Sequence, residues 1–412
     1  MCIRDRDEEG ASGVVWGEKE ITMNDGRWMI TFGAFICMGF LGMSRTFLGT
    51  ALPAIRSSLD LSILQAGTLT VLLQLGFSIA VFFGGSLSDA FKKSSILVIG
   101  CFLMGVSFIF FAYFNWFWIS LIWILLIGMG GGLIESSSNP LLIQLYPGRE
   151  STIMNFHHFF FAAGSLIGPL VMGLLLSSSI PWQWGYIGFG LSVLIIFLFL
   201  LSQKVNSVKS GGGFELKVMR KFIGEKMFVF LFFTTFFAIG VQNGVSYWMV
   251  TFLKEFRNLS ISLASTSLFL FFTCIALGRL SSGYLIPKFK EPVYLLCLFL
   301  LLSITLPISV LVPGKWAIPF FGICGLAYSG IFPCLLGMTG KLYSEKTGTA
   351  LGIIATGAGL GSMAIPWLMS FISQITTLQT GFLSFEIFVI LSLFLLSIHF
   401  KNLKIRFGSE PR

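Results

Sequence analysis

Apolar residues in this chain gather in twelve long runs, and polar residues concentrate in the connections between them. An α-helix needs about 20 mainly apolar residues to cross the hydrocarbon core of a bilayer. The expected spans are residues 28–52, 63–87, 95–113, 117–145, 153–176, 184–201, 227–253, 263–285, 293–312, 316–342, 350–372 and 382–400. The pattern therefore predicts an all-α integral membrane protein with twelve transmembrane helices.

The composition excludes an ordinary soluble domain and offers no sign of an enzyme. Of the 412 residues, 55% are hydrophobic and 11% are charged, whereas soluble domains contain about 25% charged residues. The seven cysteines are scattered and form no cluster at metal-ligand spacing, so we expect no metal site and no cofactor. No Walker loop or nucleophile–base pair is present, so the energy for any transport would come from an ion gradient.

One long polar connection, residues 203–226, separates the sixth run from the seventh. It predicts two six-helix bundles, 23–202 and 227–400, followed by a cytoplasmic tail, 401–412. Residues 1–22 contain six acids and three bases but no apolar run, which excludes a signal peptide. They are either a disordered tail or a mis-assigned start that precedes the natural one at Met23.

The distribution of basic residues predicts the orientation. With both termini in the cytoplasm, the inner segments carry 19 Lys and Arg and the outer connections carry four. Cytoplasmic loops are enriched in Lys and Arg, so we expect both termini inside and a location in the cell inner membrane.

An internal repeat links the two predicted bundles. The pattern Gly-Leu-x-x-Ser-x-x-x-Pro-x-Leu begins at Gly132 in the fourth run and at Gly325 in the tenth, an offset of 193 residues. Glu135 and Tyr328 therefore hold equivalent places. Two parallel halves suit the movement of a solute through the bilayer, with its site between the halves near the midplane.

The connection after the second run carries a motif, Gly85-x-Leu87-x-Asp89-x-Phe91-Lys92-Lys93. Its glycine permits close helix packing, its acid can face a helix N-terminus, and its two lysines can face anionic headgroups. With this motif the chain resembles the major facilitator superfamily over nearly all of residues 28–400. The resemblance implies pseudo-symmetric six-helix bundles and a gating role for Gly85, Asp89, Lys92 and Lys93.

Within that superfamily, the fourth and fifth runs resemble the fucose–galactose–proton symporter group and its bacterial hexose-transporter relatives. The resemblance rests on Glu135 with Asn139 and Pro140, on the His157-His158 pair, and on Gly164-x-x-x-Gly168-Pro169. It implies that Glu135 takes part in proton coupling. The first run departs from the group because Arg45 stands where a cavity acid is expected.

Glu135 is the candidate proton site on chemical grounds as well. A charged side chain in hydrocarbon costs roughly 2.5 to 3.5 kcal/mol on insertion scales, and a carboxyl in a low dielectric favours its protonated form, which a proton gradient can load. Asn139 lies one turn further along the same helix face. The alternative is a structural ion pair between Glu135 and Arg45.

His157 and His158 lie about 100° apart on a helix, so we expect one of them to face the cavity. We assign His158 and Arg45 to proton coupling together with Glu135. The alternative is that the histidines line the inner mouth or bind loop carbonyls. The glycine pairs Gly164/Gly168, with Pro169, and Gly357/Gly361 predict helix-packing surfaces.

Polar and aromatic residues near the middle of a span are the candidate substrate contacts. Paired amide side chains can form hydrogen bonds with two adjacent hydroxyl groups, and aromatic rings can pack on the faces of sugar rings. Both kinds of contact suit a neutral polyol. The predicted substrate-binding residues are Gln74, Asn139, Gln242, Asn243, Trp248 and Tyr328.

The leading hypothesis is a monomeric secondary active transporter that moves a small polar solute, a sugar, by proton-coupled symport. Its partners would be that solute, a proton or sodium ion and the bilayer, with no nucleic acid. The alternatives are a drug or metabolite antiporter, an organic-anion carrier that uses Arg45, and a non-transporting membrane sensor.

Overall fold

The computed structural model describes residues 26–90, 92–114, 116–146, 150–203, 222, 224–343 and 347–408. Within these ranges, the side chains of 26, 84–90, 150–152, 155, 283–284, 287, 347–349 and 407–408 are not described. The described residues form helices and no strand, and twelve helical segments are long and apolar enough to cross a membrane. The prediction of an all-α protein with twelve spans is confirmed.

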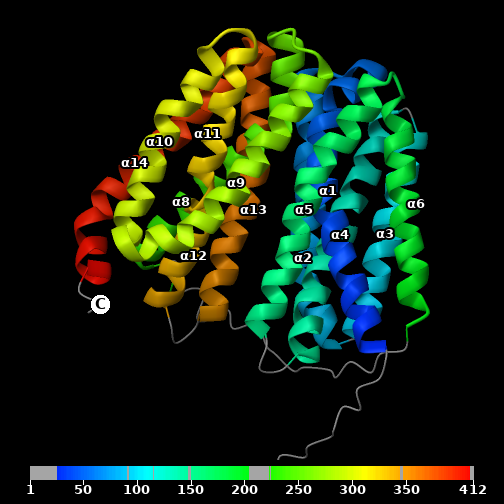
Figure 1. The fold of residues 1–412 in the computed structure, drawn as a ribbon, viewed down its shortest axis with the longest axis horizontal. Helices are drawn as coiled ribbons and strands as arrows, with labels where there is room; N and C mark the ends of the chain where they lie inside the picture. Colours follow the sequence, from blue (N-terminus) through cyan, green and yellow to red (C-terminus); the bar gives the residue numbers. More distant parts are fainter. Residues whose placement is uncertain are drawn as a thin grey trace, which may run out of the picture.

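Six of these spans come before the central connection and six after it (Figure 1). The first six are α1 (Gly26–Leu59), α2 (Ile63–Ala90), α3 (Lys93–Tyr113), α4 (Phe117–Leu145), α5 (Glu150–Ser177) and α6 (Trp182–Leu201). The others are α8 (Lys226–Thr251) with the π-helical turn η1 (Phe252–Phe256), α9 (Ile261–Phe289), α10 (Glu291–Leu311), α11 (Ala317–Ser329) with α12 (Ile331–Leu342), α13 (Thr347–Ile375) and α14 (Leu378–Gly408). A 3-10 turn, η2 (Gly314–Trp316), precedes α11.

The tenth span differs from the single helix expected for residues 316–342, because Gly330 separates α11 from α12. Pro333 lacks the N–H that would bond to the carbonyl of Ser329 in a continuous helix. Gly330 also lies against the ring of Tyr294, where a methyl group would come within 2.6 Å of a ring carbon. A missing backbone bond and a bulky neighbour together account for the break.

Helices α1 to α6 pack mainly on one another, as do α8 to α14, and the two bundles repeat the same contacts. A Cβ at Gly132 on α4 would lie 2.5 Å from the carbonyl oxygen of Phe77 on α2. The equivalent Gly325 on α11 would place one 2.3 Å from the carbonyl oxygen of Phe271 on α9. Only glycine allows backbones to approach this closely, so the repeat in the sequence corresponds to equivalent helix packing.

The glycine pairs of α5 and α13 also occupy equivalent positions, again 193 residues apart. A Cβ at Gly164 would lie 1.8 Å from the carbonyl oxygen of Gly39 on α1, and one at Gly361 would lie 2.0 Å from that of Phe236 on α8. Both pairs therefore lie where α5 meets α1 and where α13 meets α8.

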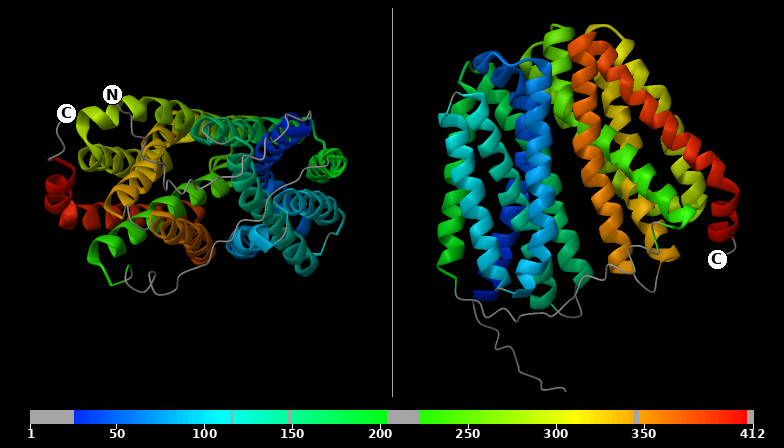
Figure 2. Two further views of the ribbon diagram at one scale, coloured as in Figure 1. Left: turned by 90° about the horizontal axis from the view of Figure 1, so that it is seen from below. Right: turned by 180° about the vertical axis from the view of Figure 1, so that it is seen from behind.

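The two bundles meet away from the chain termini. We call the end of the bundles at which Gly26 and Gly408 lie the terminal face and the other end the opposite face. The opposite face is at the top of Figure 2, right, where the bundles come closest, and they diverge toward the terminal face. The contacts between bundles join α1 to α8, α2 to α13 and α5 to α9.

Close packing and polar contacts seal the opposite face. A Cβ at Gly67 on α2 would lie 2.1 Å from Ser370 Oγ on α13, and one at Gly173 on α5 would lie 2.5 Å from Ser265 Cβ on α9. Arg56 on α1 forms an ion pair with Glu255 on η1. Among the described residues, small side chains and the Arg56–Glu255 pair therefore join the bundles at this face.

Replacing Gly361 by Ala should destabilise the protein because the new methyl group meets the backbone of Phe236. Overpacking of this kind costs about 1–3 kcal/mol. Thermal unfolding in detergent should show a lower apparent Tm. The matched control is Gly352→Ala on the same helix, where a Cβ meets nothing within 4 Å. Equal apparent Tm values for the two variants would contradict the packing role of Gly361.

Candidate functional site

The candidate site lies between the bundles and is built mainly on α1, α2 and α4. Arg45 on α1 is half-buried and donates a hydrogen bond from Nη1 to Gln74 Oε1 on α2, at 2.5 Å. Its guanidinium also stacks over the ring of Phe77, 3.9 Å from the centroid. Gln74 in turn donates from Nε2 to Ser78 Oγ at 3.4 Å. These contacts hold the guanidinium against α2.

A short contact with the second bundle places this group at the boundary between the halves. A Cβ at Gly359 on α13 would lie 3.1 Å from Ser78 Oγ and 3.8 Å from Gln74 Nε2. Gln74 is 5% exposed, so its amide is enclosed by α1, α2 and α13. The site therefore uses both halves of the chain.

Glu135 reaches the same region because consecutive glycines bring α4 close to its neighbours. Gly130 lies against Met104 on α3, Gly131 against Leu41 on α1, and Gly132 against Phe77 on α2. One turn later, Glu135 is half-buried and interacts electrostatically with Arg45. In the part of the chain that the structure describes, no ion pair within 4 Å joins the two. The glycine run thus places a carboxylate near a cation without a direct contact.

Asn139 follows Glu135 by one turn on α4. It is half-buried, and its buried Oδ1 has no hydrogen-bond partner among the described atoms. An unpartnered buried carbonyl oxygen costs free energy unless a solute or water donates to it. Asn139 is therefore an available acceptor beside Glu135.

The two histidines of α5 differ in their surroundings. His157 is fully buried, and its Nε2 lies 3.0 Å from Ser138 Oγ on α4. His158 is exposed and interacts electrostatically with Arg279 on α9, in the other bundle. His158, rather than His157, therefore has an exposed imidazole near the second bundle, and its part in proton coupling remains a prediction.

The predicted contacts in the second bundle are divided between half-buried and fully buried residues. Gln242 and Asn243 on α8 are half-buried, and Asn243 Nδ2 donates to Ser362 Oγ on α13 at 2.6 Å. Trp248 and Tyr328 are 0% and 1% exposed, and neither the indole N–H nor the phenol hydroxyl has a described partner. In this conformation those two rings offer no surface to a solute, so their role in binding remains a prediction.

Glu386 on α14 was not identified from the sequence, although an acid inside the twelfth apolar run is the same signal that identified Glu135. It is half-buried, and its buried Oε2 has no partner among the described atoms. It interacts electrostatically with Tyr328 and Cys324 on α11. The second bundle thus contains a carboxylate of its own beside the tyrosine that is equivalent to Glu135.

The loop motif is described only in part. Gly85 and Asp89 lie on α2, but their side chains are outside the described residues. Lys92 is exposed at the N-cap of α3, and Lys93 is buried in its first turn. The gating role of the motif therefore remains a prediction.

Comparison with known proteins places the chain in a family. The model of the Major Facilitator Superfamily matches residues 34–366, with a second match over 258–405. A putative glucose/galactose transporter of Helicobacter pylori (strain ATCC 700392 / 26695) is 21% identical over 366 residues, which cover 83% of this chain and 88% of the relative.

Solved structures share the fold at low sequence identity. A bacterial homologue of the human lysosomal transporter Spinster, in an inward-facing and unoccupied conformation, has a TM-score of 0.80 and 13% identity, covering 94% of this chain and 100% of its own. The D-xylose–proton symporter has a TM-score of 0.75 and 15% identity, covering 90% and 97%. The family match over most of the chain, together with twelve spans in this fold, shows that the protein is a multi-pass membrane transporter of small solutes and belongs to the major facilitator superfamily.

Proposed function

We propose that this transporter moves a small neutral polar solute, a sugar, together with protons by alternating access. The observation that carries the proposal is the state of Glu135. It is a half-buried carboxylate inside a membrane span, near Arg45, with no ion pair within 4 Å in the described structure. A carboxylate without a fixed counter-ion can be neutralised by a proton, which lowers the cost of moving the loaded site through the bilayer.

The surrounding groups support a hydroxyl-rich solute. Asn139 offers a free acceptor, Gln74 presents an amide at the bundle boundary, and Gln242 and Asn243 are half-buried amides on α8. Amides both donate to and accept from hydroxyls, so they recognise a polyol without requiring a charge on it. The name of the Helicobacter pylori relative supports a hexose as the solute to test first.

The proposed orientation puts both termini in the cytoplasm of a cell whose inner membrane holds the protein as a monomer. It follows from the excess of Lys and Arg in the segments expected inside, which carry 19, over the outer connections, which carry four. The sealed opposite face is then external, and the arrangement in Figure 1 corresponds to an inward-facing transporter.

A second candidate function is transport of an organic anion. It is favoured by Arg45, a half-buried guanidinium whose described hydrogen bond goes to the neutral amide of Gln74. A carboxylated solute could supply the missing counter-ion by binding bidentately to the guanidinium. In this case Arg45 would select the solute rather than adjust Glu135.

Replacing Glu135 by Gln should abolish solute-driven alkalinisation in proteoliposomes. It should also reduce accumulation of the solute against its gradient at least about tenfold, because Glu135 is the group proposed to carry the proton. Exchange of labelled for unlabelled solute, which needs no net proton movement, should continue. Glu291→Gln, which removes a carboxylate paired with Lys341 at the terminal face, is the matched control. Proton-coupled accumulation by Glu135→Gln at the wild-type level would refute the assignment.

Replacing Arg45 by Gln distinguishes the two candidate functions. For a sugar carrier, the variant should keep the apparent affinity for neutral hexoses within about threefold, because the guanidinium makes no obligatory contact with the solute. For an anion carrier, the affinity should fall roughly 10- to 100-fold for carboxylated solutes only, because the charge-assisted pair between Arg45 and the solute carboxylate is lost. Competition assays with paired neutral and carboxylated sugars give the answer, and selective loss of the acidic sugars would overturn the sugar assignment.

A further inference from the structure

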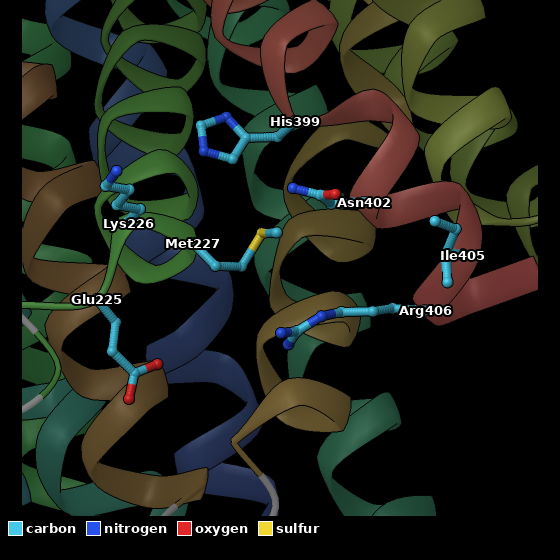
Figure 3. Close-up of a pocket in the computed structure, with 7 residues that line it drawn as sticks. All are labelled: Glu225, Lys226, Met227, His399, Asn402, Ile405 and Arg406. Carbon is cyan, nitrogen blue, oxygen red and sulfur yellow. The ribbon is translucent and has the colours of Figure 1, made fainter.

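A cavity of about 510 Å³ opens at the terminal face, away from the candidate transport site (Figure 3). It lies between the first turn of α8 and the last turns of α14. Its lining residues are Glu225, Lys226, Met227, His399, Asn402, Ile405 and Arg406. Nothing in the proposed transport cycle uses these residues.

The cavity presents two cations that are free to bind an anion. Lys226 and Arg406 are exposed, and neither takes part in an ion pair within 4 Å in the described part of the chain. In Figure 3 the side chains of His399, Asn402 and Arg406 extend from α14 toward α8. An anion in this space would find the guanidinium of Arg406 and the amide of Asn402 on the α14 side. On the α8 side Met227 points toward α14, and the exposed Lys226 lies beside it with its ammonium turned away from α14.

The one acid of the cavity is already engaged. Glu225 accepts a hydrogen bond from the hydroxyl of Tyr343, which follows α12. Burial and then this hydrogen bond raise the pKa of Tyr343 above its ordinary value, so the hydroxyl remains a donor at neutral pH. Glu225 keeps its negative charge, but one carboxylate against the two cations Lys226 and Arg406 leaves the lining with a net positive charge.

An apolar path leads from the cavity along the membrane-facing side of α14. Phe394, Ile398 and Ile405 are 59%, 57% and 62% exposed, and their spacing puts them on one helix face together with Asn402. Deeper in, the ring of His399 stacks on Phe230 of α8 with centroids 4.8 Å apart and closes the space between the helices. A ligand here is therefore in contact with water, two cations and an exposed apolar stripe.

We propose that this cavity binds the headgroup of an anionic phospholipid. The phosphodiester would lie between Lys226 and Arg406, Asn402 would donate to an oxygen of the headgroup, and the acyl chains would follow Phe394 and Ile398. Basic pockets between transmembrane helices are suited to anionic headgroups. A bound lipid would link α8 to α14 at the point where the second bundle begins and ends.

Binding of phosphatidylglycerol to the full chain can be measured by native mass spectrometry in a neutral detergent, with phosphatidylcholine as the zwitterionic comparison. The double variant Lys226→Gln/Arg406→Gln should lose roughly 10- to 30-fold in affinity for phosphatidylglycerol, as expected for two basic residues near a lipid phosphate. The matched control is Lys401→Gln/Lys404→Gln, which removes two exposed charges from the same helix outside the cavity. It should remain within about twofold of wild type.

Each other outcome overturns the proposal. Equal losses in the two double variants would show attraction to diffuse surface charge rather than to a site. Equal affinity for phosphatidylcholine would exclude an anion-selective site, and binding of glycerol phosphate as tight as that of the lipid would show that the acyl chains contribute nothing. Since all four lysine and arginine side chains are exposed, unchanged thermal unfolding of the lipid-free variants will show that the fold is intact.

Discussion

The candidate site depends on how closely α4 approaches its neighbours. Four glycines between positions 128 and 132 remove the side chains that would otherwise separate α4 from α1, α2 and α3. Lipid provides no hydrophobic force to join helices, so close backbone packing supplies the attraction. The result is that Glu135 lies near Arg45, while the hydrogen bond of Arg45 to Gln74 keeps the guanidinium on α2. A bulkier α4 would move the carboxylate away from the boundary between the bundles.

The second bundle uses the same packing with different chemistry. Gly325 repeats the contact of Gly132, but the residue three positions later is Tyr328 instead of Glu135. The carboxylate of this bundle is Glu386, which comes from a different helix, α14, and lies near Tyr328. In the part of the chain that the structure describes, each half therefore has a half-buried acid well inside a membrane span, Glu135 in the first and Glu386 in the second. The equivalence of the halves extends to their packing but not to their polar groups.

The spans could be predicted from sequence because the thickness of the bilayer sets their length locally. The ends of helices were less predictable: α1 continues to Leu59 and α14 to Gly408, since a helix can extend past the membrane where its residues become polar. Pro333 is a local signal of the break at Gly330, whereas the packing of Gly330 against Tyr294 on another helix is not visible in any local pattern. Likewise, the choice of Gln74 as the partner of Arg45 depends on the relative height of α1 and α2. Glu386, in contrast, was visible in the sequence and was missed.

Alternating access requires the sealed opposite face to open during transport. Spin labels at Ser57 and Asn258, two exposed positions beside the ion pair of Arg56 with Glu255, report the separation of the bundles there. Distances should be measured by double electron–electron resonance in proteoliposomes, in a variant whose exposed Cys297 is replaced by Ser. We expect a short distance between the labels at rest and a second, longer distance whose population grows when transported hexose and protons are supplied. A single, unchanged distance in a variant that still transports would contradict it.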